Sequence, residues 1–313
     1  MVKAQGHKPD VSEKRPYLKH CFFIVGPTAT GKSELAAAVA QRLGAEVVSA
    51  DAFQIYRGLD VLTAKPDQAT LAKAPHHLVG TVSLSEEMNA EKYRAMAEKI
   101  IARGKAVIVV GGTGLYVKAL THGLATLPGA NSKLRERLER TTSEELFRSL
   151  CTLDPDGAEK IDRQNRRRLI RAVEVCLLTG KPFSSQRIEW NQPLPEDGVL
   201  VTRERSELYA RINQRVEEMF AAGVVEEVRA VKDLGPTAEK TLGLREIRAL
   251  LAGEISQAEC IAKIQQATRR YAKRQLTWFQ RQTNFTPLNL SAHRTSEAIE
   301  FISQSVSRVF ARG

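Results

Sequence analysis

Short apolar segments alternate with helix-forming segments along much of the chain. The apolar segments are Cys21–Val25, Glu46–Ala50, Ala106–Val110 and Val199–Thr202. Runs of four or five largely apolar residues that end near Gly or Pro are typical of strands buried on both faces of a parallel sheet. Ser33–Leu43 and Ala90–Arg103 have the composition and spacing of helices. This alternation predicts an α/β fold with a parallel sheet.

The middle of the chain has a different pattern. Ser132–Thr179 is charged, has helical spacing and lacks strand signals, and the Pro- and Gly-containing stretch 191–198 follows it. Further helices are expected at Glu204–Leu234 and Ala258–Gln282. We therefore predict a flexible arm at 1–17, an α/β core with C-terminal helices formed by 18–129 and 197–313, and a mainly α-helical insertion domain at 130–196.

The composition points to a polyanionic partner. Lys and Arg outnumber Asp and Glu by 47 to 36 in 313 residues, which gives a net charge of +11. The four cysteines lie far apart in the sequence, without the spacing of a zinc site. Nothing indicates secretion, and no apolar run near the start is long enough to span a membrane. We expect a cytoplasmic protein.

A phosphate-binding loop follows the first predicted strand. The sequence from 26 to 33 fits G-x-x-x-x-G-K-[ST] at every fixed position, namely Gly26, Pro27, Thr28, Ala29, Thr30, Gly31, Lys32 and Ser33. Backbone N–H groups and Lys32 would bind the phosphates of a diphosphate or nucleotide, and the Ser33 hydroxyl would bind Mg²⁺. A glycine-rich turn without a ligand is the alternative, but the strand before it and the helix after it favour the P-loop. The fold class is thus a P-loop parallel-sheet core with a helical insertion.

The position of the nearest acid argues against a hydrolytic motor. Motors commonly carry a carboxylate at the end of a later apolar strand. Ala106–Val110 instead continues into Gly-Gly-Thr113, and the acid, Asp51, follows the second strand. The carboxyl ends of parallel strands converge, so Asp51 and Thr113 are expected beside the P-loop. This arrangement favours a transferase with two substrates.

Five segments in order resemble one enzyme family. They are GPTATGKS at 26–33, DAFQIYRGLDVLTAKP at 51–66, HHLVG at 76–80, GGTGLY at 111–116 and TRRYAKRQLTWF at 268–279. Together they are similar to the bacterial tRNA dimethylallyltransferases, also called tRNA isopentenyltransferases. The resemblance covers nearly all of residues 20–282. From the cysteine count we expect no zinc-finger extension of the kind that eukaryotic relatives carry.

The resemblance implies a reaction with Mg²⁺ as cofactor. Dimethylallyl diphosphate would bind in the P-loop, and its prenyl group would pass to N6 of the adenine 3′ to the anticodon in tRNA. Asp51 would act as the base on the weakly nucleophilic amine, with Thr113 as a second catalytic residue. Arg215 matches an arginine near the diphosphate. The target base would leave the stack, as in base-flipping enzymes, and the protein is expected to act as a monomer.

The same resemblance implies contacts with the tRNA anticodon stem-loop. The matching positions are Asp51, Ala52, Phe53 and Gln54; Thr113; Arg135; Arg167, Arg168, Leu169, Ile170 and Arg171; and Lys240, Thr241, Leu242, Gly243, Leu244 and Arg245. Two positions depart from the family pattern. Ala52 stands where many relatives have Ser, and Leu244 stands where many have Tyr.

Two runs of basic residues support an RNA partner. One comprises Arg163, Arg166, Arg167, Arg168 and Arg171, and the other comprises Lys263, Arg269, Arg270, Lys273, Arg274 and Arg281. A solvated helix face is the alternative for both. Trp278 and Phe279 have the spacing of core anchors. We interpret His76-His77 as structural, and Asp154 as the cap of the helix that follows Pro155.

Three other functions stay open at this point. A small-molecule kinase would share the P-loop and Asp51 but would not need the basic insertion. A prenyltransferase of free adenine nucleotides would share the whole site. A non-enzymatic RNA-binding nucleotide switch would not need Asp51 facing Thr113. Labelled dimethylallyl diphosphate offered to tRNA, AMP or ATP separates these functions.

Overall fold

A computed structural model describes residues 18–125, 127–186 and 197–311, and these divide into two compact units. The first unit combines Met1–His122 with Gln192–Gly313, and the second is Gly123–Asn191. The predicted arm at 1–17 lies outside the described residues.

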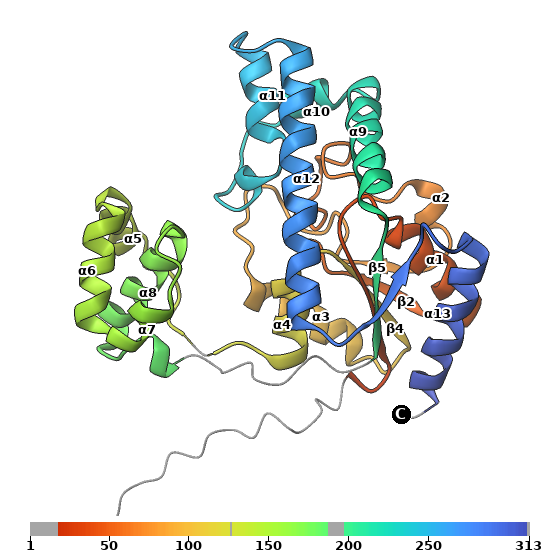
Figure 1. Cartoon of the computed structure of the whole chain (residues 1–313), viewed down its shortest axis with the longest axis horizontal. Helices are drawn as coiled ribbons and strands as arrows, with labels where there is room; N and C mark the ends of the chain where they lie inside the picture. Colours follow the sequence, from red (N-terminus) through yellow and green to blue (C-terminus); the bar gives the residue numbers. More distant parts are fainter. Residues whose placement is uncertain (1–17, 126, 187–196, 312–313) are drawn as a thin grey trace, which may run out of the picture. The chain divides into compact units, whose positions relative to one another are not determined.

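The first unit contains a parallel six-stranded sheet in the order β3-β2-β4-β1-β5-β6 (Figure 1). The strands are β1 (Cys21–Val25), β2 (Glu46–Ser49), β3 (His76–His77), β4 (Val107–Gly111), β5 (Gly198–Thr202) and β6 (Thr286–Asn289). The registers pair Val25 with Gly111 and Ser49 with Val110. The loops that follow β1, β2 and β4 therefore lie side by side at the carboxyl ends of these strands. The predicted α/β fold with a parallel sheet is confirmed.

Helices cover both faces of this sheet (Figure 1). On one face, α1 (Lys32–Leu43) and α13 (Thr295–Phe310) pack against apolar side chains of the strands, such as Ile24, Ile108 and Val201. On the other face lie α3 (Ala90–Ile101) and α4 (Gly114–His122), joined by the stacked rings of Tyr93 and Tyr116. The short helix α2 (Gln68–Leu71) precedes β3. The sequence analysis did not predict β3, β6 or α13.

A group of helices lies beyond the carboxyl ends of the strands. It consists of α9 (Arg205–Ala221), α10 (Val224–Ala230), α11 (Leu244–Leu251) and α12 (Gln257–Gln282). Their apolar faces share a core with Leu59 and Leu62, which lie in the loop after β2. At 26 residues, α12 is about 39 Å long, and it contacts α4 as well as α9 and α11. It therefore connects the helical group with the loops of the sheet.

The second unit is helical, with α5 (Ser132–Arg140), α6 (Ser143–Leu153), α7 (Pro155–Lys160) and α8 (Arg166–Thr179). Its core includes Leu146, Leu150, Leu169 and Val173. The unit starts at Gly123 rather than at 130. One reason is that Arg171 of α8 donates a hydrogen bond to the Pro128 carbonyl, which holds the chain before α5 against α8. Residues 187–196 of the predicted insertion lie outside the described residues.

Candidate active site

The P-loop between β1 and α1 has a conformation that favours anion binding. Ala29 and Gly31 have left-handed backbone conformations, with φ of 65° and 91°. A Cβ at Gly26 would lie 2.3 Å from the Val201 carbonyl oxygen, so only glycine fits there. Because α1 begins at Lys32, the N–H groups of its first turn have no helical partner and can face a phosphate.

Side chains of the P-loop itself and of distant elements bind the backbone of this loop. Lys32 donates to the Pro27 carbonyl at 3.1 Å, Arg211 to the Ala29 carbonyl at 2.9 Å, and Arg203 to the Thr30 carbonyl at 2.9 Å. The amide of Thr28 donates to Oε1 of Gln275 at 2.9 Å. The shape of the loop is therefore stabilised before any phosphate arrives.

The side chains of Lys32 and Arg215 bring positive charge to the site. Burial lowers the pKa of Lys32 to about 8, and repulsion by Arg215 acts in the same direction, while attraction to Asp51 opposes the decrease. Arg215 of α9 approaches the Thr28 hydroxyl at 3.5 Å, and burial lowers its pKa as well. Lys32 is buried and Arg215 is half-buried beside it, and two like charges in such a place are costly without an anion. A diphosphate between them would relieve this repulsion.

Asp51 and Thr113 occupy neighbouring loops after β2 and β4. Oδ1 of Asp51 accepts hydrogen bonds from the backbone N–H groups of Phe53 and Gln54 at 2.9 and 3.2 Å. The backbone N–H of Ala52 donates to the Thr113 hydroxyl at 3.0 Å. Within the described residues, Oδ2 of Asp51 takes part in no hydrogen bond. This oxygen is available to accept a proton.

A cleft of about 780 Å³ connects these groups. The P-loop residues Gly31, Lys32 and Ser33 line it together with Asp51 and Arg215. Apolar side chains from the loop after β2 and from α9 and α12 also line it, among them Leu62, Val216, Met219 and Ile264. Thr113 is not among the residues that line the cleft. Its hydroxyl instead supports the backbone beside Asp51.

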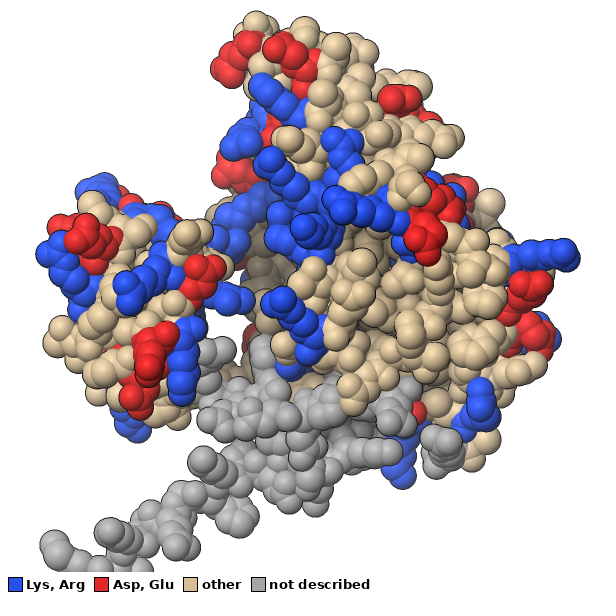
Figure 2. All heavy atoms as spheres, viewed as in Figure 1, with Lys and Arg blue, Asp and Glu red and all other residues tan. Residues whose placement is uncertain are grey.

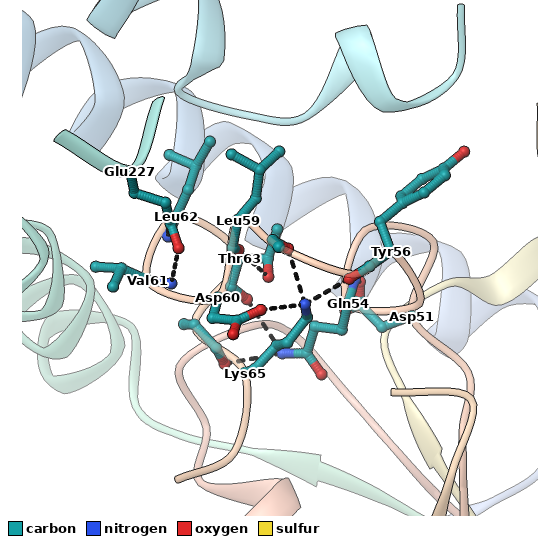
Figure 3. A network of polar contacts seen from close by, with 12 residues as sticks. Asp51, Gln54, Tyr56, Leu59, Asp60, Val61, Leu62, Thr63, Lys65 and Glu227 are labelled. Carbon is teal, nitrogen blue, oxygen red and sulfur yellow. Dashed lines mark hydrogen bonds and ion pairs between the residues drawn. The ribbon is translucent and has the colours of Figure 1, made fainter. Parts of the chain in front are cut away.

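The wall of the cleft between Gln54 and Pro66 is a loop held by its own polar groups (Figure 3). Nε2 of Gln54 donates to the carbonyls of Thr63 and Ala64 at 3.1 and 2.9 Å. Lys65 donates to the carbonyls of Tyr56 and Gly58 and pairs with Asp60. The amide nitrogen of Gln54, a predicted tRNA contact, is thus bonded within the protein.

One carboxylate attaches this loop to the helical group. Glu227 of α10 accepts hydrogen bonds from the N–H groups of Val61 and Leu62 at 2.9 and 2.8 Å (Figure 3). Leu59 and Ala64 in the same loop have positive φ values of 53° and 49°. Such backbone conformations are unfavourable for residues with a side chain. The bonds to Glu227 and Lys65 therefore stabilise a loop whose backbone has two unfavourable conformations.

The predicted RNA segment at 240–245 exposes only part of its side chains. Lys240 and Arg245 are exposed, whereas Thr241 and Leu244 are buried. Gly243 precedes α11 with φ of 91°. Leu244 packs into the core shared by α9 to α12. In this chain, the side chain at position 244 therefore faces the interior.

Basic side chains follow the outer face of α12 (Figure 2). Lys263, Arg270, Lys273, Arg274 and Arg281 are exposed, while Arg269 donates to the Asn213 side chain. Phe279 is fully buried, as expected for a core anchor. Trp278 packs over Gly114, where a Cβ would lie 2.2 Å from the indole ring. The helix thus combines a basic outer face with an inner face that contacts the loops of the site.

The basic residues of the second unit serve different purposes. Oε2 of the fully buried Glu174 accepts hydrogen bonds from Arg135 at 2.9 Å and Arg171 at 2.8 Å. Arg166 donates to the carbonyls of Glu139 and Thr141. Among the described residues, Arg167 and Arg168 are exposed and have no ion pair. Leu169 and Ile170, two predicted tRNA contacts, have their side chains in the core of the unit.

The remaining polar pairs have structural roles. His77 pairs with Glu46 at 2.7 Å, and Nδ1 of His76 lies 2.7 Å from the Ala74 carbonyl oxygen. Asp154 caps α7 by accepting a hydrogen bond from the Gly157 N–H. In the described part of the chain, no group of three or more His, Cys, Asp or Glu side chains is placed to hold a metal ion.

Residues 54–282 match the sequence pattern of a family described as IPP transferase. The chain belongs to this family. It is 43% identical to the tRNA dimethylallyltransferase of Akkermansia muciniphila, with 83% of this chain and 90% of that protein covered. It is 45% identical to tRNA dimethylallyltransferase 1 of Citrifermentans bemidjiense, over 81% and 87%.

Solved structures with the same fold are found as well. The tRNA isopentenylpyrophosphate transferase of Bacillus halodurans superposes with a TM-score of 0.66 at 32% identity, covering 93% of this chain and 98% of that one. A eukaryotic dimethylallyltransferase shares the fold, with a TM-score of 0.71 at 24% identity over 91% and 80%.

In this IPP transferase, several residues of the site escaped the sequence analysis. Arg203, Arg211 and Glu227 were not predicted, and Lys65 and Gln275 were only parts of matching segments. A signal existed for Arg211, because it stands four residues before Arg215 and so shares its helix face.

No helix among the described residues has the length and apolar character needed to cross a membrane.

Proposed function

We propose that the protein transfers a dimethylallyl group from dimethylallyl diphosphate to N6 of the adenine 3′ to the anticodon in tRNA and releases diphosphate. One observation carries the proposal: a single cleft contains the P-loop, the cations Lys32 and Arg215, and the carboxylate of Asp51. This cleft offers binding groups for a diphosphate and a base for an amine. The names of the relatives agree with both substrates.

The diphosphate of the donor would bind to the N–H groups at the start of α1 and to Lys32 and Arg215. As the C–O bond to the prenyl group breaks, negative charge grows on the diphosphate oxygens. Fixed cations in a buried site stabilise such charge more strongly than water does. The apolar side chains that line the same cleft, such as Leu62 and Met219, suit a hydrocarbon group.

The residues present are compatible with Mg²⁺. Magnesium usually keeps several waters and takes few protein ligands besides phosphate oxygens, so a cluster of protein carboxylates is not required. Ser33 lines the cleft at the start of α1, where its hydroxyl would be the protein ligand. When bound, Mg²⁺ would neutralise charge on the diphosphate.

Asp51 would accept the proton of the adenine amine. The exocyclic amine is a weak nucleophile because its lone pair is delocalised into the ring. Two backbone N–H groups fix Oδ1 of Asp51 and leave Oδ2 for the amine. A positioned base of this kind contributes about 10²–10⁴-fold to rate. Thr113 would assist by fixing the backbone next to Asp51.

The tRNA would contact exposed basic side chains on both units, including Arg167 and Arg168 on one and Lys273 and Arg274 on the other. To reach Asp51, the adenine must leave the stack of the anticodon loop. We expect the enzyme to work as a monomer in the cytoplasm. No disulfide joins its four cysteines, which agrees with a reducing compartment.

The test is an acceptor assay with radiolabelled dimethylallyl diphosphate and purified protein. The proposal expects label in tRNA that contains adenine 3′ to the anticodon, and none in the same tRNA with guanine at that position. Label in AMP or ATP would instead indicate a prenyltransferase of free nucleotides. Absence of label in every acceptor, with phosphate transfer from ATP to a small molecule, would indicate a kinase.

A further inference from the structure

Gln275 connects the P-loop with the loop that follows β4. Its Oε1 accepts a hydrogen bond from the Thr28 N–H, and its Nε2 donates to the Gly112 carbonyl, both at 2.9 Å. The residue lies on the inner face of α12 and is 5% exposed. A buried amide that uses both of its ends fixes the two loops relative to each other.

A second contact from the same helix face continues this connection. Tyr271 lies one turn before Gln275 in α12, and its hydroxyl lies near the Thr113 side chain and near Gln275. The Thr113 hydroxyl in turn accepts the Ala52 N–H beside Asp51. The bonds of Gln275 and of Thr113 thus connect the P-loop, through the loop that follows β4, with the backbone that carries Asp51.

The neighbouring glycines show that α12 approaches these loops closely. A Cβ at Gly112 would lie 2.2 Å from Nε2 of Gln275, and a Cβ at Gly114 would lie 2.2 Å from the ring of Trp278. Contacts this tight leave little freedom for the helix to shift. The position of Gln275 is therefore determined by packing as well as by its hydrogen bonds.

We propose that Gln275 is a positioning residue that sets the placement of the diphosphate-binding loop relative to Asp51. The inference rests on the proposed function, because the donor carbon and the adenine amine must meet between these two loops. Transfer depends steeply on the alignment of the reacting atoms, and a displacement of 1 Å can cost about 10²-fold in rate. Binding of either substrate alone needs only one of the loops.

The first test separates turnover from binding in Gln275→Leu, which keeps the approximate volume and removes both hydrogen bonds. We expect kcat to fall by about 10²-fold and the Kd for inorganic diphosphate to change by less than about threefold. Gln265→Leu is the matched control, since Gln265 lies on the same helix and bonds to Asn213 and Glu217, away from the P-loop. It should retain kcat.

The second test is a double-mutant cycle with Asp51→Asn in single-turnover assays. If Gln275 acts by aligning the donor with the base, its loss matters less once the base is gone, so the combined loss is smaller than the product of the single losses. Multiplicative losses would show that Gln275 acts independently of Asp51 and would overturn the proposal.

The third test uses Gln275→Glu, in which a protonated carboxyl keeps one donor and one acceptor. Burial raises the pKa of a carboxyl, so the activity of this variant relative to wild type should rise as the pH falls from 8 to 6. Both proteins contain the same ionisable groups on the adjoining elements, namely Tyr271, Lys32, Asp51 and Arg215. Titration of these groups therefore affects the variant and wild type alike. A ratio independent of pH would contradict the proposal.

These outcomes are distinct from failure of the proposed function. A wild-type protein that transfers no prenyl group to tRNA would refute the function itself. With an active wild type, an unchanged kcat in Gln275→Leu would overturn the positioning role. A rise in the Kd for inorganic diphosphate that matches the loss in kcat would also overturn it, because Gln275 would then serve the P-loop alone.

Discussion

The backbone N–H of Ala52 donates a hydrogen bond to the hydroxyl of Thr113, 3.0 Å away. The bond joins the loops that follow β2 and β4, so the carboxylate of Asp51 is held between two neighbouring strands. A Cβ at Gly111 would lie 2.3 Å from the Ala50 carbonyl oxygen, so the backbones are already as close as they can be. Asp51 is thereby presented to the cleft on a rigid support.

Asp51→Asn tests the role of this carboxylate as a base. Asn keeps an oxygen that can accept the N–H groups of Phe53 and Gln54, so the loop should keep its shape. We expect the single-turnover rate of transfer to fall by about 10²-fold or more, with donor affinity little changed. A rate within a few-fold of wild type would exclude Asp51 as the base.

Donor binding should depend on the charge of Lys32. Burial lowers the pKa of Lys32 to about 8 in the free protein. A bound diphosphate favours the protonated form, so affinity should be greatest below pH 8 and weaken as the pH rises through 8, by up to about tenfold per unit. Calorimetric titration of inorganic diphosphate between pH 6.5 and 9.5 measures this. Lys32→Arg, which stays charged, provides the control for ionisation of the ligand; equal slopes would contradict the prediction.

Magnesium dependence should be carried by the hydroxyl of Ser33. In wild type, EDTA should weaken donor binding and slow transfer, because the diphosphate then lacks its counter-ion. Ser33→Ala should bind the donor more weakly and respond less to EDTA, whereas Ser33→Thr, which keeps a hydroxyl, should behave like wild type. An identical response of all three proteins to EDTA would place any Mg²⁺ elsewhere.

Arg167 and Arg168 should contribute to the salt dependence of tRNA binding. Each phosphate contact adds about 0.7–0.9 to the slope of log K against log salt. Arg167→Ala with Arg168→Ala should therefore flatten the slope by up to about 2 units and leave donor binding intact. Arg140→Ala with Arg148→Ala is the control, since these arginines pair with acids on their own helices. If wild type and the double mutant have equal slopes and both bind tightly, the RNA site lies on α12 instead.

Glu174 should be a stability determinant of the second unit. Burial alone would raise its pKa, but hydrogen bonds from Arg171 and Arg135 lower it below the usual value. Glu174→Ala leaves two arginines without their buried carboxylate. It should lower the free energy of unfolding, measured with urea, by about 3 kcal/mol. Glu144→Ala, an exposed residue paired with Arg148, should cost less than about 0.5 kcal/mol.

The lowered pKa of Glu174 also determines how the difference in unfolding free energy between wild type and Glu174→Ala depends on pH. A carboxyl whose folded pKa is lowered stabilises the protein above its unfolded pKa of about 4.3, and this stabilisation is lost as the pH falls through the folded value. The unfolding curves of wild type and Glu174→Ala should therefore approach each other in acid. A constant difference down to pH 3 would contradict the assignment.

Local sequence patterns predicted the elements that depend on local physics. The P-loop and the strands Cys21–Val25 and Ala106–Val110 follow from short runs of residues. The strand β3 consists of two histidines, and the edge strand β6 contains Pro287, so neither has a pattern of its own. The site residues that the sequence left out, such as Glu227 and Gln275, bind partners more than 160 residues away, and no spacing rule reaches that far.

The residues predicted to contact tRNA show the same limit of local sequence patterns. The burial of Leu169 and Ile170 follows from their place on the apolar face of α8 and was within reach of helical periodicity. The pairing of Arg171 with Glu174 was also within reach, since the two stand three residues apart on α8. The pairing of Arg135 with Glu174 was not, since it depends on how α5 packs against α8. A basic run in a sequence thus contains both structural arginines and exposed ones, and only the fold separates them.

The 2.2 Å approach of a Cβ at Gly112 to the amide of Gln275 also limits how this enzyme can vary during evolution. A side chain at 112 leaves no space for a glutamine at 275, and a shorter residue at 275 leaves two backbone groups without partners. Either single change is disadvantageous, and only a paired change could preserve the contact. Across an alignment of many relatives, positions 112 and 275 should therefore be fixed together or should covary, whereas 112 and 265 should vary independently.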